Sequence, residues 1–315
     1  MYFYVTVPAI AFIVYKLYQK WSCGMCTSDA RMTGKVVIVT GANTGIGFET
    51  AKDLARRGAR IILACRDEGR GTTAMHKIIE TTQNKNVVFK QLDLASLKSV
   101  RAFAEDVIRT EPAIHVLVNN AGTGKLDNSL TEDSLPIEAQ INHFGPFLLT
   151  TLLLPLIKAS APSRIVNVSS LLHKVGKVDP ESFHKPAKNS IQHMRVYSNT
   201  KLANMLFTRK LSRDLEGSGV TVNCLHPGAV STDIFRDKYA ISRFFIKLLF
   251  KTSFEGAQTS IYLAVAPELE NVSGKYFVDC QEAVPSKSAV DDKLADELWE
   301  LSERVVANSE PKKNI

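Results

Sequence analysis

A glycine-rich segment directly after a short apolar run is the feature that most limits how this chain can fold. Residues 36–39 read Val-Val-Ile-Val, residues 40–47 read Thr-Gly-Ala-Asn-Thr-Gly-Ile-Gly, and residues 46–57 have the 3.6-residue apolar spacing of a helix. A bare backbone between a strand and a helix can approach a phosphate closely, and the helix N-terminus offers it free N–H groups. We therefore predict a dinucleotide-binding loop, although a glycine-rich turn without a ligand remains the alternative. Its residues are Gly41, Ala42, Asn43, Thr44, Gly45, Ile46 and Gly47.

The rest of the chain continues this alternation of strand and helix. Apolar runs without in/out alternation predict strands at 61–64, 87–89, 116–118, 165–168 and 220–222. Helical spacing predicts helices at 68–82, 97–110, 197–216 and 254–265, and one long helix with its lead-in at 134–160. Such strands are covered on both faces, as in a parallel sheet. We expect an α/β fold, a doubly wound and mostly parallel Rossmann sheet with helices on both faces, in a single domain over 35–307 with a tail at 308–315.

The N-terminus predicts a membrane signal anchor over residues 1–21, followed by a linker over 22–34. Residues 1–15 carry no charge, Lys16 and Lys20 follow, and Tyr15, Tyr18 and Trp21 suit the membrane interface. Basic residues after the apolar stretch, not before it, argue against a cleaved signal peptide and favour keeping the rest of the chain in the cytosol. The endoplasmic reticulum is the default membrane for such an anchor. The alternative is a buried N-terminal helix, because the apolar run is shorter than a full span.

The charge and the cysteines narrow the classes of partner. The net charge of +7 and a pI near 9.1 fit attraction to an anionic membrane surface, and no run of five Lys or Arg indicates nucleic-acid binding. Cys23 and Cys26 form a C-x-x-C, but no second pair completes a zinc site, so no metal is expected. The two thiols are expected to be inert, with lipidation left open.

The end of the second predicted strand bears on the choice of cofactor. Residues 64–67 read Ala-Cys-Arg-Asp. A site specific for NAD places a carboxylate here to bind the ribose 2′-hydroxyl, whereas an arginine can hold a 2′-phosphate. Arg66 therefore favours NADP(H), although Asp67 follows it directly and Arg66 could be a solvated surface residue.

A tyrosine and a lysine four residues apart form the candidate proton-transfer pair. Tyr197 and Lys201 lie on one face of a predicted helix. An ordinary tyrosine has a pKa of about 10, and a neighbouring ammonium lowers it by stabilising the phenolate. Ser169 and Ser170 end one predicted strand, and Asn119 begins the Asn-Asn-Ala-Gly segment that ends another. These polar groups should therefore meet at the carboxyl edge of the sheet, where open α/β sheets bind ligands.

These motifs together resemble the classical short-chain dehydrogenase/reductase superfamily over residues 35–280. They are the glycine loop, Asp93-Leu94, Asn119-Asn120-Ala121-Gly122, Asn142, Ser170, Tyr197 with Lys201, and Pro227-Gly228. Finer strings, such as Leu-Ala-Cys-Arg-Asp at 63–67 and Ser-Asn-Thr-Lys-Leu-Ala-Asn at 198–204, are similar to the microsomal retinol dehydrogenases, which act on retinoids and other lipid aldehydes.

The resemblance implies a role for each matching residue. Tyr197 would exchange a proton with the substrate oxygen, Ser170 would hydrogen-bond that oxygen, and Lys201 would lower the pKa of Tyr197 and bind the nicotinamide ribose. Asn142 would hold a water of the proton relay. Further cofactor contacts would come from Asp93 at the adenine, Asn119 at the ribose, Thr232 at the carboxamide, and Ala121, Pro227 and Gly228 along the pocket. Asn119 and Asn142 could instead satisfy backbone groups, and Asp93 could cap a helix.

The substrate side departs from the retinol group in two places. Residues 123–125 read Thr-Gly-Lys where those relatives have apolar residues, and Pro146 is unusual. Residues 241–251 mix three basic with seven large apolar residues, within a substrate-covering lobe expected at about 228–255. They could form a membrane-facing mouth for a lipophilic substrate, or a helix that packs on the core or on a second subunit of a homodimer.

We therefore expect an NADP(H)-dependent oxidoreductase that interconverts retinol and retinal or related lipophilic alcohols and aldehydes. A steroid or xenobiotic carbonyl reductase of the same chemistry is one alternative. The other is a non-catalytic membrane adaptor on a dinucleotide-binding scaffold. Ser170, Tyr197 and Lys201 together argue against the adaptor, because a scaffold has no physical need for all three.

Overall fold

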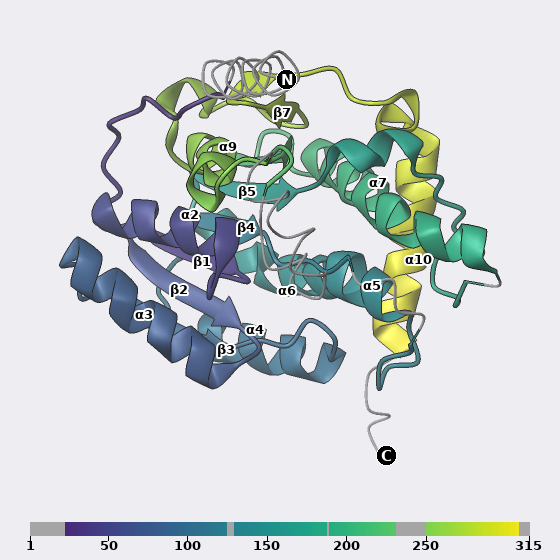
Figure 1. Ribbon diagram of the computed structural model, residues 1–315, viewed down its shortest axis with the longest axis horizontal. Coiled ribbons are helices and arrows are strands. Elements are labelled where there is room, and N and C mark those ends of the chain that lie inside the picture. The colour runs from purple at the N-terminus through teal and green to yellow at the C-terminus, as the bar shows by residue number, and fades with distance from the viewer. Residues whose placement is uncertain (1–22, 125–128, 188, 231–249, 309–315) are drawn as a thin grey trace, which may run out of the picture.

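The computed structural model of the chain describes residues 23–124, 129–187, 189–230 and 250–308 (Figure 1). Its centre is one eight-stranded sheet with the order β3-β2-β1-β4-β5-β6-β7-β8, in which only β8 is antiparallel to its neighbour. The strands are β1 (Val36–Thr40), β2 (Arg60–Cys65), β3 (Val87–Gln91), β4 (Val116–Asn119), β5 (Ser163–Val168), β6 (Val220–His226), β7 (Tyr276–Val278) and β8 (Gln281–Glu282).

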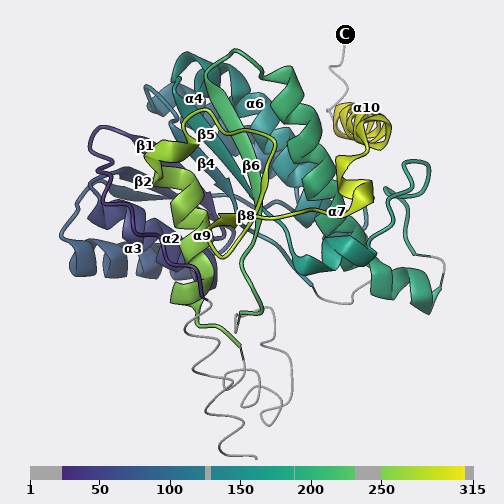
Figure 2. The ribbon, with the colours of Figure 1, turned by 90° about the horizontal axis from the view of Figure 1, so that it is seen from above.

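Helices cover both faces of this sheet (Figure 2). One face packs against α2 (Gly45–Arg56), α3 (Glu68–Thr82) and α9 (Ser253–Val265). The other packs against α4 (Leu97–Thr110), α6 (Gly145–Ala159) and α7 (Ser190–Asp214), and α10 (Asp292–Asn308) packs on α7. The remaining elements are the short α5 (Ile137–Ala139), the π-helical turn η1 (Gln140–Phe144) and the 3-10 turns η2 (Leu171–Val175), η4 (Pro267–Leu269) and η5 (Lys287–Val290). The expected α/β sheet with helices on both faces is confirmed.

Strand β1 is buried on both faces, which accounts for the absence of alternating apolar and polar residues in its sequence. All five of its residues are buried, with Ile38 in the core on one face and Val37 and Val39 in the core on the other. A central strand between two helical layers needs apolar side chains on both sides. The strand order reverses direction at β1 and β4, and the carboxyl ends of these two strands therefore border a crevice between helices of opposite layers.

The bounds predicted from the sequence lie within a few residues of the observed bounds for most of these helices and strands. Helices α3 and α4 have the expected bounds, whereas α7 begins at Ser190, seven residues before the predicted start at 197. Strands β7 and β8 and helix α10 were not predicted. Strands of three and two residues are too short to show a period, but α10 does carry the spacing of an amphipathic helix in its buried Ala295, Leu298 and Leu301.

The helix expected over 134–160 is interrupted by a π-helical turn. The N–H of Gly145 donates to the carbonyl of Gln140, five residues back, and α6 continues from Gly145. Pro146 stands at the first turn of α6, and a proline has no N–H to give to the carbonyl of Asn142 four residues earlier. The expected long helix with its lead-in is therefore present as one helical run over Ile137–Ala159, and the wider turn inside it contains Asn142, one of the predicted site residues.

Two predicted segments lie largely or wholly outside the described residues. They are the signal anchor at 1–21 and the greater part of the substrate-covering lobe, which includes residues 231–249 and Thr232; the tail beyond residue 308 is outside as well. Within the described ranges, only Ile137–Ala159 is long and apolar enough to cross a membrane, and 67% of its most apolar stretch is buried. Because α6 packs on the sheet in the main core, the apolar residues of this segment belong to the core of the domain.

Candidate functional site

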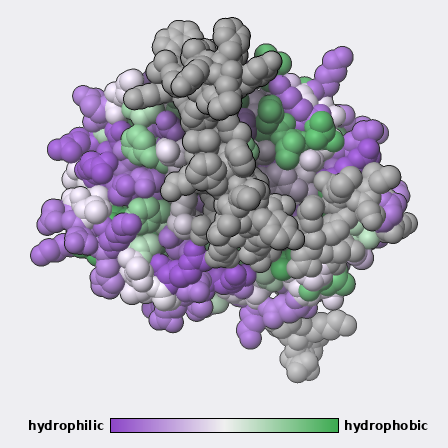
Figure 3. All heavy atoms as spheres, in the orientation of Figure 1, coloured by the Kyte–Doolittle hydropathy of each residue, from purple (hydrophilic) through white to green (hydrophobic). Residues whose placement is uncertain are grey.

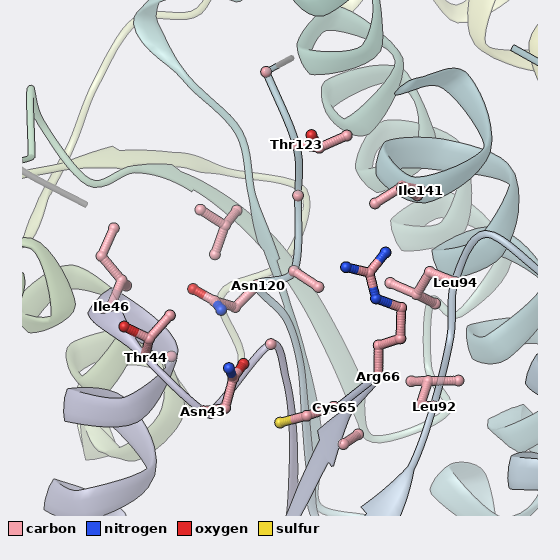
Figure 4. A pocket seen from close by; sticks show the side chains of 18 of the residues that line it. Asn43, Thr44, Ile46, Cys65, Arg66, Leu92, Leu94, Asn120, Thr123 and Ile141 are labelled. Atoms are coloured by element: carbon pink, nitrogen blue, oxygen red, sulfur yellow. The ribbon is translucent and has the colours of Figure 1, made fainter. Parts of the chain in front are cut away.

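A cavity of about 410 Å³ lies at the carboxyl ends of β1, β2, β4 and β5 (Figure 4). Its volume is in the range of a small-molecule pocket. The lining joins the glycine loop, the ends of the strands and the helix that carries the Tyr–Lys pair. The predicted site residues along it are Gly41, Asn43, Thr44, Gly45, Ile46, Gly47, Arg66, Asp93, Ala121, Tyr197, Lys201 and Pro227.

The glycine loop is built so that side chains would not fit. Gly41 has φ +67°, which favours glycine, and its N–H donates to the carbonyl of Ala64 at 2.8 Å. A Cβ on Gly47 would lie 2.4 Å from Asn120 Nδ2 and 2.5 Å from the carbonyl oxygen of Gly41. Gly45 has φ +62° and begins α2, whose N-terminus faces the pocket. The loop therefore offers bare backbone and free N–H groups to an anionic ligand. Ala42 is fully buried below it.

Thr40 and Asn120 hold the glycine loop against the end of β4. The Thr40 hydroxyl accepts from the N–H groups of Asn120 and Ala121, each at 3.0 Å, and the Asn120 amide donates to the Thr40 carbonyl at 2.8 Å. Asn120 also lines the pocket, whereas sequence reasoning named its neighbour Asn119. Asn119 is 6% exposed, and its amide donates to Thr150 and Asn167 in the core. This placement matches the alternative in which Asn119 satisfies buried polar groups.

At the end of β2 the neighbours Arg66 and Asp67 have different tasks. Arg66 is exposed and extends its guanidinium into the pocket (Figure 4). The Asp67 carboxylate accepts from the N–H of Arg70 at 2.8 Å and caps α3. Asp93 lines the pocket farther along, where its carboxylate accepts from the N–H of Ala95 at 2.9 Å. The cap of α4 is Ser96, so Asp93 is not needed as a helix cap.

Tyr197 and Lys201 line the other end of the pocket, and Ser170, which is not part of the lining, lies beside Tyr197. The Tyr197 hydroxyl interacts with the Ser170 side chain, and Lys201 Nζ lies 5.6 Å from the centre of the Tyr197 ring. Lys201 is 4% exposed and its ammonium donates to the Val168 carbonyl at 3.1 Å. The three residues are thus on two neighbouring elements, the end of β5 and the face of α7, as the sequence predicted.

Burial governs the electrostatics of this group. It raises the pKa of Tyr197, the Ser170 hydrogen bond lowers it, and the carboxylate of Glu138 raises it further. Burial also lowers the pKa of Lys201 to about 8. The sequence led us to expect that Lys201 lowers the pKa of Tyr197. In the protein alone the pKa of Tyr197 is raised instead, and Lys201 does not contribute to the shift. The two neighbouring serines have different partners. Ser169 is buried and its hydroxyl donates to the Lys201 carbonyl at 2.7 Å, whereas Ser170 hydrogen-bonds Tyr197.

Asn142 links the π-helical turn η1 to helix α7, which carries Tyr197 and Lys201. Its Oδ1 accepts from the N–H of Thr123 at 2.8 Å, and its amide donates to the Thr123 carbonyl at 2.8 Å and to the Thr200 hydroxyl at 3.0 Å. A Cβ on Gly122 would lie 3.2 Å from Asn142 Oδ1 and 3.4 Å from Lys201 Nζ, so both side chains border Gly122. Gly228 lies beside Lys251 and outside the pocket lining, and Thr232 lies outside the described residues.

Sequence reasoning missed several pocket residues. Apart from Asn120, they include the apolar Leu92, Leu94, Ile137 and Ile141. A position directly after a strand end could have indicated the first two, because such positions reach the ligand edge of a parallel sheet. Ile137 and Ile141 lie on α5 and η1, and no sequence pattern gives the path of that segment. Within the described ranges, no group of three or more His, Cys, Asp or Glu could hold a metal ion.

Apolar side chains are exposed close to this end of the pocket. Leu171, Leu172 and Val175 directly follow Ser170 and are 46–61% exposed, and Val284 is 85% exposed. The N–H of Ser286 donates to His173 Nε2 at 3.3 Å, so the segment that carries Val284 lies beside η2. The face seen in Figure 3 is hydrophilic over much of its area, with a few apolar groups gathered locally.

Comparison with known proteins agrees with this geometry. The model of the short chain dehydrogenase family matches residues 35–241. The chain is 49% identical to retinol dehydrogenase 13 of Mus musculus over 90% of this chain and 87% of that protein. It is 45% identical to retinol dehydrogenase 11 of Mus musculus over 96% of this chain and 97% of that protein. An uncharacterized protein from Mycobacterium paratuberculosis has a similar structure, with a TM-score of 0.73, 31% identity and coverage of 90% and 98% of the two chains.

Proposed function

This chain belongs to the short-chain dehydrogenase family and resembles its retinol dehydrogenases, and from this we propose that it is an NADP(H)-dependent oxidoreductase that interconverts retinol and retinal or related lipophilic alcohols and aldehydes. The observation that carries the proposal is the meeting of Tyr197 and Lys201 at one end of a pocket whose other walls include the glycine loop and Arg66, with Ser170 hydrogen-bonded to Tyr197. The family membership supports a nicotinamide dinucleotide as the cofactor.

The residues present fit such a dinucleotide. The close approach at Gly41 and Gly47 leaves backbone without side chains where a pyrophosphate would lie, and the N-terminus of α2 faces the same space. When bound, the nicotinamide accepts or supplies the hydride of the reaction. Thr44, Asn43 and Ile46 border the cavity on the phosphate side, and Ala121 and Pro227 border it toward the catalytic group.

The protein's own groups handle the proton. In carbonyl reduction the Tyr197 hydroxyl would donate its proton to the substrate oxygen, and in alcohol oxidation the phenolate would take one. Ser170 would hydrogen-bond the same oxygen and favour the geometry of transfer. The raised pKa of Tyr197 keeps its proton in place at neutral pH, which suits the role of acid in reduction. Lys201, held by the Val168 carbonyl, lies on the inner side of the ring and would bind the ribose.

The choice of NADP(H) over NAD(H) rests on the end of β2. Arg66 reaches into the pocket, and its guanidinium suits a 2′-phosphate. The neighbouring Asp67 also borders the pocket, and its Oδ1 accepts from the N–H of Arg70 as the cap of α3. This use of the carboxylate as a cap supports Arg66 as the group that would meet the ribose 2′-position.

The substrate class rests on apolar surface beside the catalytic group. The exposed Leu171, Leu172 and Val175 follow Ser170 directly and would contact a lipophilic substrate. We further propose that the enzyme is anchored by residues 1–21 in the endoplasmic reticulum membrane, with one domain over 35–307 facing the cytosol, and that it can pair as a homodimer. The predicted segment 1–21 and the basic, apolar residues 241–251 are the grounds for membrane contact.

A turnover assay tests the proposal. The full-length protein in membranes is supplied with NADPH and all-trans-retinal, and Tyr197→Phe is the matched variant because it removes only the hydroxyl. We expect the variant to lose at least about a hundredfold in kcat, the range for loss of a general acid. Reduction at the parent rate by Tyr197→Phe would contradict the mechanism. A parent enzyme that reduces steroid ketones but no lipid aldehyde would contradict the substrate class alone.

A further inference from the structure

Three segments that are far apart in the sequence meet at the turn between β7 and β8. They are the start of the described linker at Gly24, the segment Lys251–Thr252 before α9, and the turn residues Asp279 and Cys280. Asp279 and Cys280 have φ angles of +51° and +59°, and Val278 pairs with Gln281 across them. A two-residue hairpin turn with both φ angles positive tolerates aspartate or asparagine at its first position.

The Asp279 carboxylate contacts both of the other segments. It forms an ion pair with the Lys251 ammonium, whose side chain is only 11% exposed, and it accepts from the N–H of Gly24 at 3.4 Å. The linker lies directly against the turn, because a Cβ on Gly24 would fall 1.8 Å from the Asp279 carbonyl oxygen. The Cys23 thiol also lies beside Lys251. Only a glycine at position 24 permits this contact.

Lys251 in turn contacts the wall of the dinucleotide pocket. The Lys251 side chain packs over Gly228, because a Cβ on Gly228 would lie 2.8 Å from Lys251 Cδ. The backbone N–H of Lys251 donates to the Ala229 carbonyl at 2.8 Å. Gly228 has φ +90° and follows Pro227, which lines the pocket. A continuous chain of contacts therefore runs from Gly24 through Asp279 and Lys251 to Pro227.

We propose that Asp279 is a positioning residue, which fixes the pocket wall at Pro227–Gly228 through Lys251 and ties that wall to the linker at Gly24. The inference rests on the proposed use of the pocket for a nicotinamide dinucleotide. Asp279 touches neither cofactor nor substrate. Its consequence is that dinucleotide affinity depends on how the linker from the N-terminal segment is seated.

The test measures NADPH affinity of the full-length protein in detergent micelles, together with kcat at saturating NADPH and the Tm. Asp279→Asn keeps an acceptor for Gly24 and a residue that tolerates the turn, and removes the charge that holds Lys251. Lys251→Met keeps the apolar stem over Gly228. Each is expected to raise the Kd for NADPH about fivefold, at the lower end of couplings between sites, with kcat changed by less than about twofold. Gly24→Ala is expected to raise the Kd as well, because its methyl group displaces the linker.

The ion pair of Lys275 with Glu282 on the same hairpin is the matched control. Its side chains are about half exposed, and Glu282→Gln is expected to leave the Kd unchanged. An unchanged Kd in Asp279→Asn, or an equal rise in Glu282→Gln, would overturn the positioning role. An unchanged Kd in Gly24→Ala would overturn the tie to the linker. A parent chain that binds neither NADPH nor NADH would overturn the proposed function as well, which separates the two failures.

Discussion

The amide of Asn142 donates a hydrogen bond to the hydroxyl of Thr200 at 3.0 Å and so joins the π-helical turn to the helix of Tyr197 and Lys201. The Thr200 hydroxyl donates onward to the Tyr197 carbonyl at 2.8 Å. The position of Tyr197, the proposed proton donor, along α7 is therefore coupled to the wider turn that Pro146 favours. The π-helical turn orients the Asn142 side chain so that its amide contacts both the segment of Thr123 and helix α7 at Thr200.

Asn142→Ala is expected to lower both stability and turnover. It removes hydrogen bonds to the backbone of Thr123 and to Thr200 in a site that is 1% exposed, and leaving such partners unsatisfied costs about 1–3 kcal/mol. Urea unfolding and kcat with NADPH and retinal measure the two effects. Thr200→Ala separates them, because it keeps the bonds to Thr123. Full turnover in Asn142→Ala would exclude a role in the proton relay.

Gly47→Ala is expected to abolish dinucleotide binding. Its methyl group would lie within 2.5 Å of both Asn120 Nδ2 and the Gly41 carbonyl, so the loop must shift away from the phosphate position. Gly69→Ala is the control, because its methyl group would meet only Asp67 Oδ1 at 3.6 Å. Fluorescence titration with NADPH gives the affinities. Equal affinities in the two variants would mean that the close approach at Gly47 does not serve a ligand.

The sequence predicted the sheet and the proximity of Tyr197, Lys201 and the serine pair at 169–170 because both depend on local patterns. Apolar runs such as residues 36–39 mark a strand covered on two faces, and the spacing of Tyr197 and Lys201 places them on one helical face. Parallel strands bring their carboxyl ends to one edge, so the pair Ser169-Ser170 could be placed beside them without coordinates, and the family resemblance selected Ser170.

What the sequence could not give depends on contacts between distant segments. Asn119 and Asn120 are indistinguishable in a strand-end motif, and only the side to which each side chain points separates the core amide from the pocket amide. The link of Asp279 to Gly24 spans 255 residues and follows from an unusual turn conformation. The sign of the Tyr197 pKa shift was likewise not predictable, because burial and Glu138 act through the tertiary structure.

Glu138→Gln is expected to lower the pKa of Tyr197. The Glu138 carboxylate disfavours the phenolate, so removing its charge makes the phenol easier to ionise. Reduction needs the protonated form, and its rate should begin to fall at a lower pH than in the parent; oxidation should begin to rise at a lower pH. Profiles of kcat against pH in both directions measure this, with the exposed Glu216→Gln as control. A shift of either limb to higher pH would contradict the assigned electrostatics.

His143 is expected to make the fold sensitive to acid. It is fully buried among Phe144, Phe147 and Phe183, and burial lowers its pKa from 6.5 to about 3. The unfolded chain therefore binds a proton that the folded chain refuses, and stability falls as pH drops from about 6.5 toward 3, by about 1.4 kcal/mol per pH unit. Urea unfolding at pH 7 and pH 5 should show a smaller loss for His143→Phe than for the parent. The exposed His76→Gln should behave as the parent does, and an equal loss in His143→Phe would assign the acid sensitivity to other groups.

Arg66→Ala is expected to reduce the preference for NADPH over NADH. The guanidinium at the end of β2 is the positive group that would face a 2′-phosphate, and a hydrogen bond to a charged group contributes about 1.5–3 kcal/mol, or roughly ten- to a hundredfold in affinity. Asp67→Asn tests the neighbour, since an asparagine still caps α3 through the N–H of Arg70 but carries no charge to repel the phosphate. The ratio of kcat/KM for the two cofactors is the measurement. Arg66→Ala should lower the ratio, and Asp67→Asn should leave it unchanged or raise it. If Arg66→Ala leaves the ratio unchanged while kcat/KM for both cofactors falls equally, Arg66 contributes to general phosphate attraction and the selection of NADP(H) lies elsewhere.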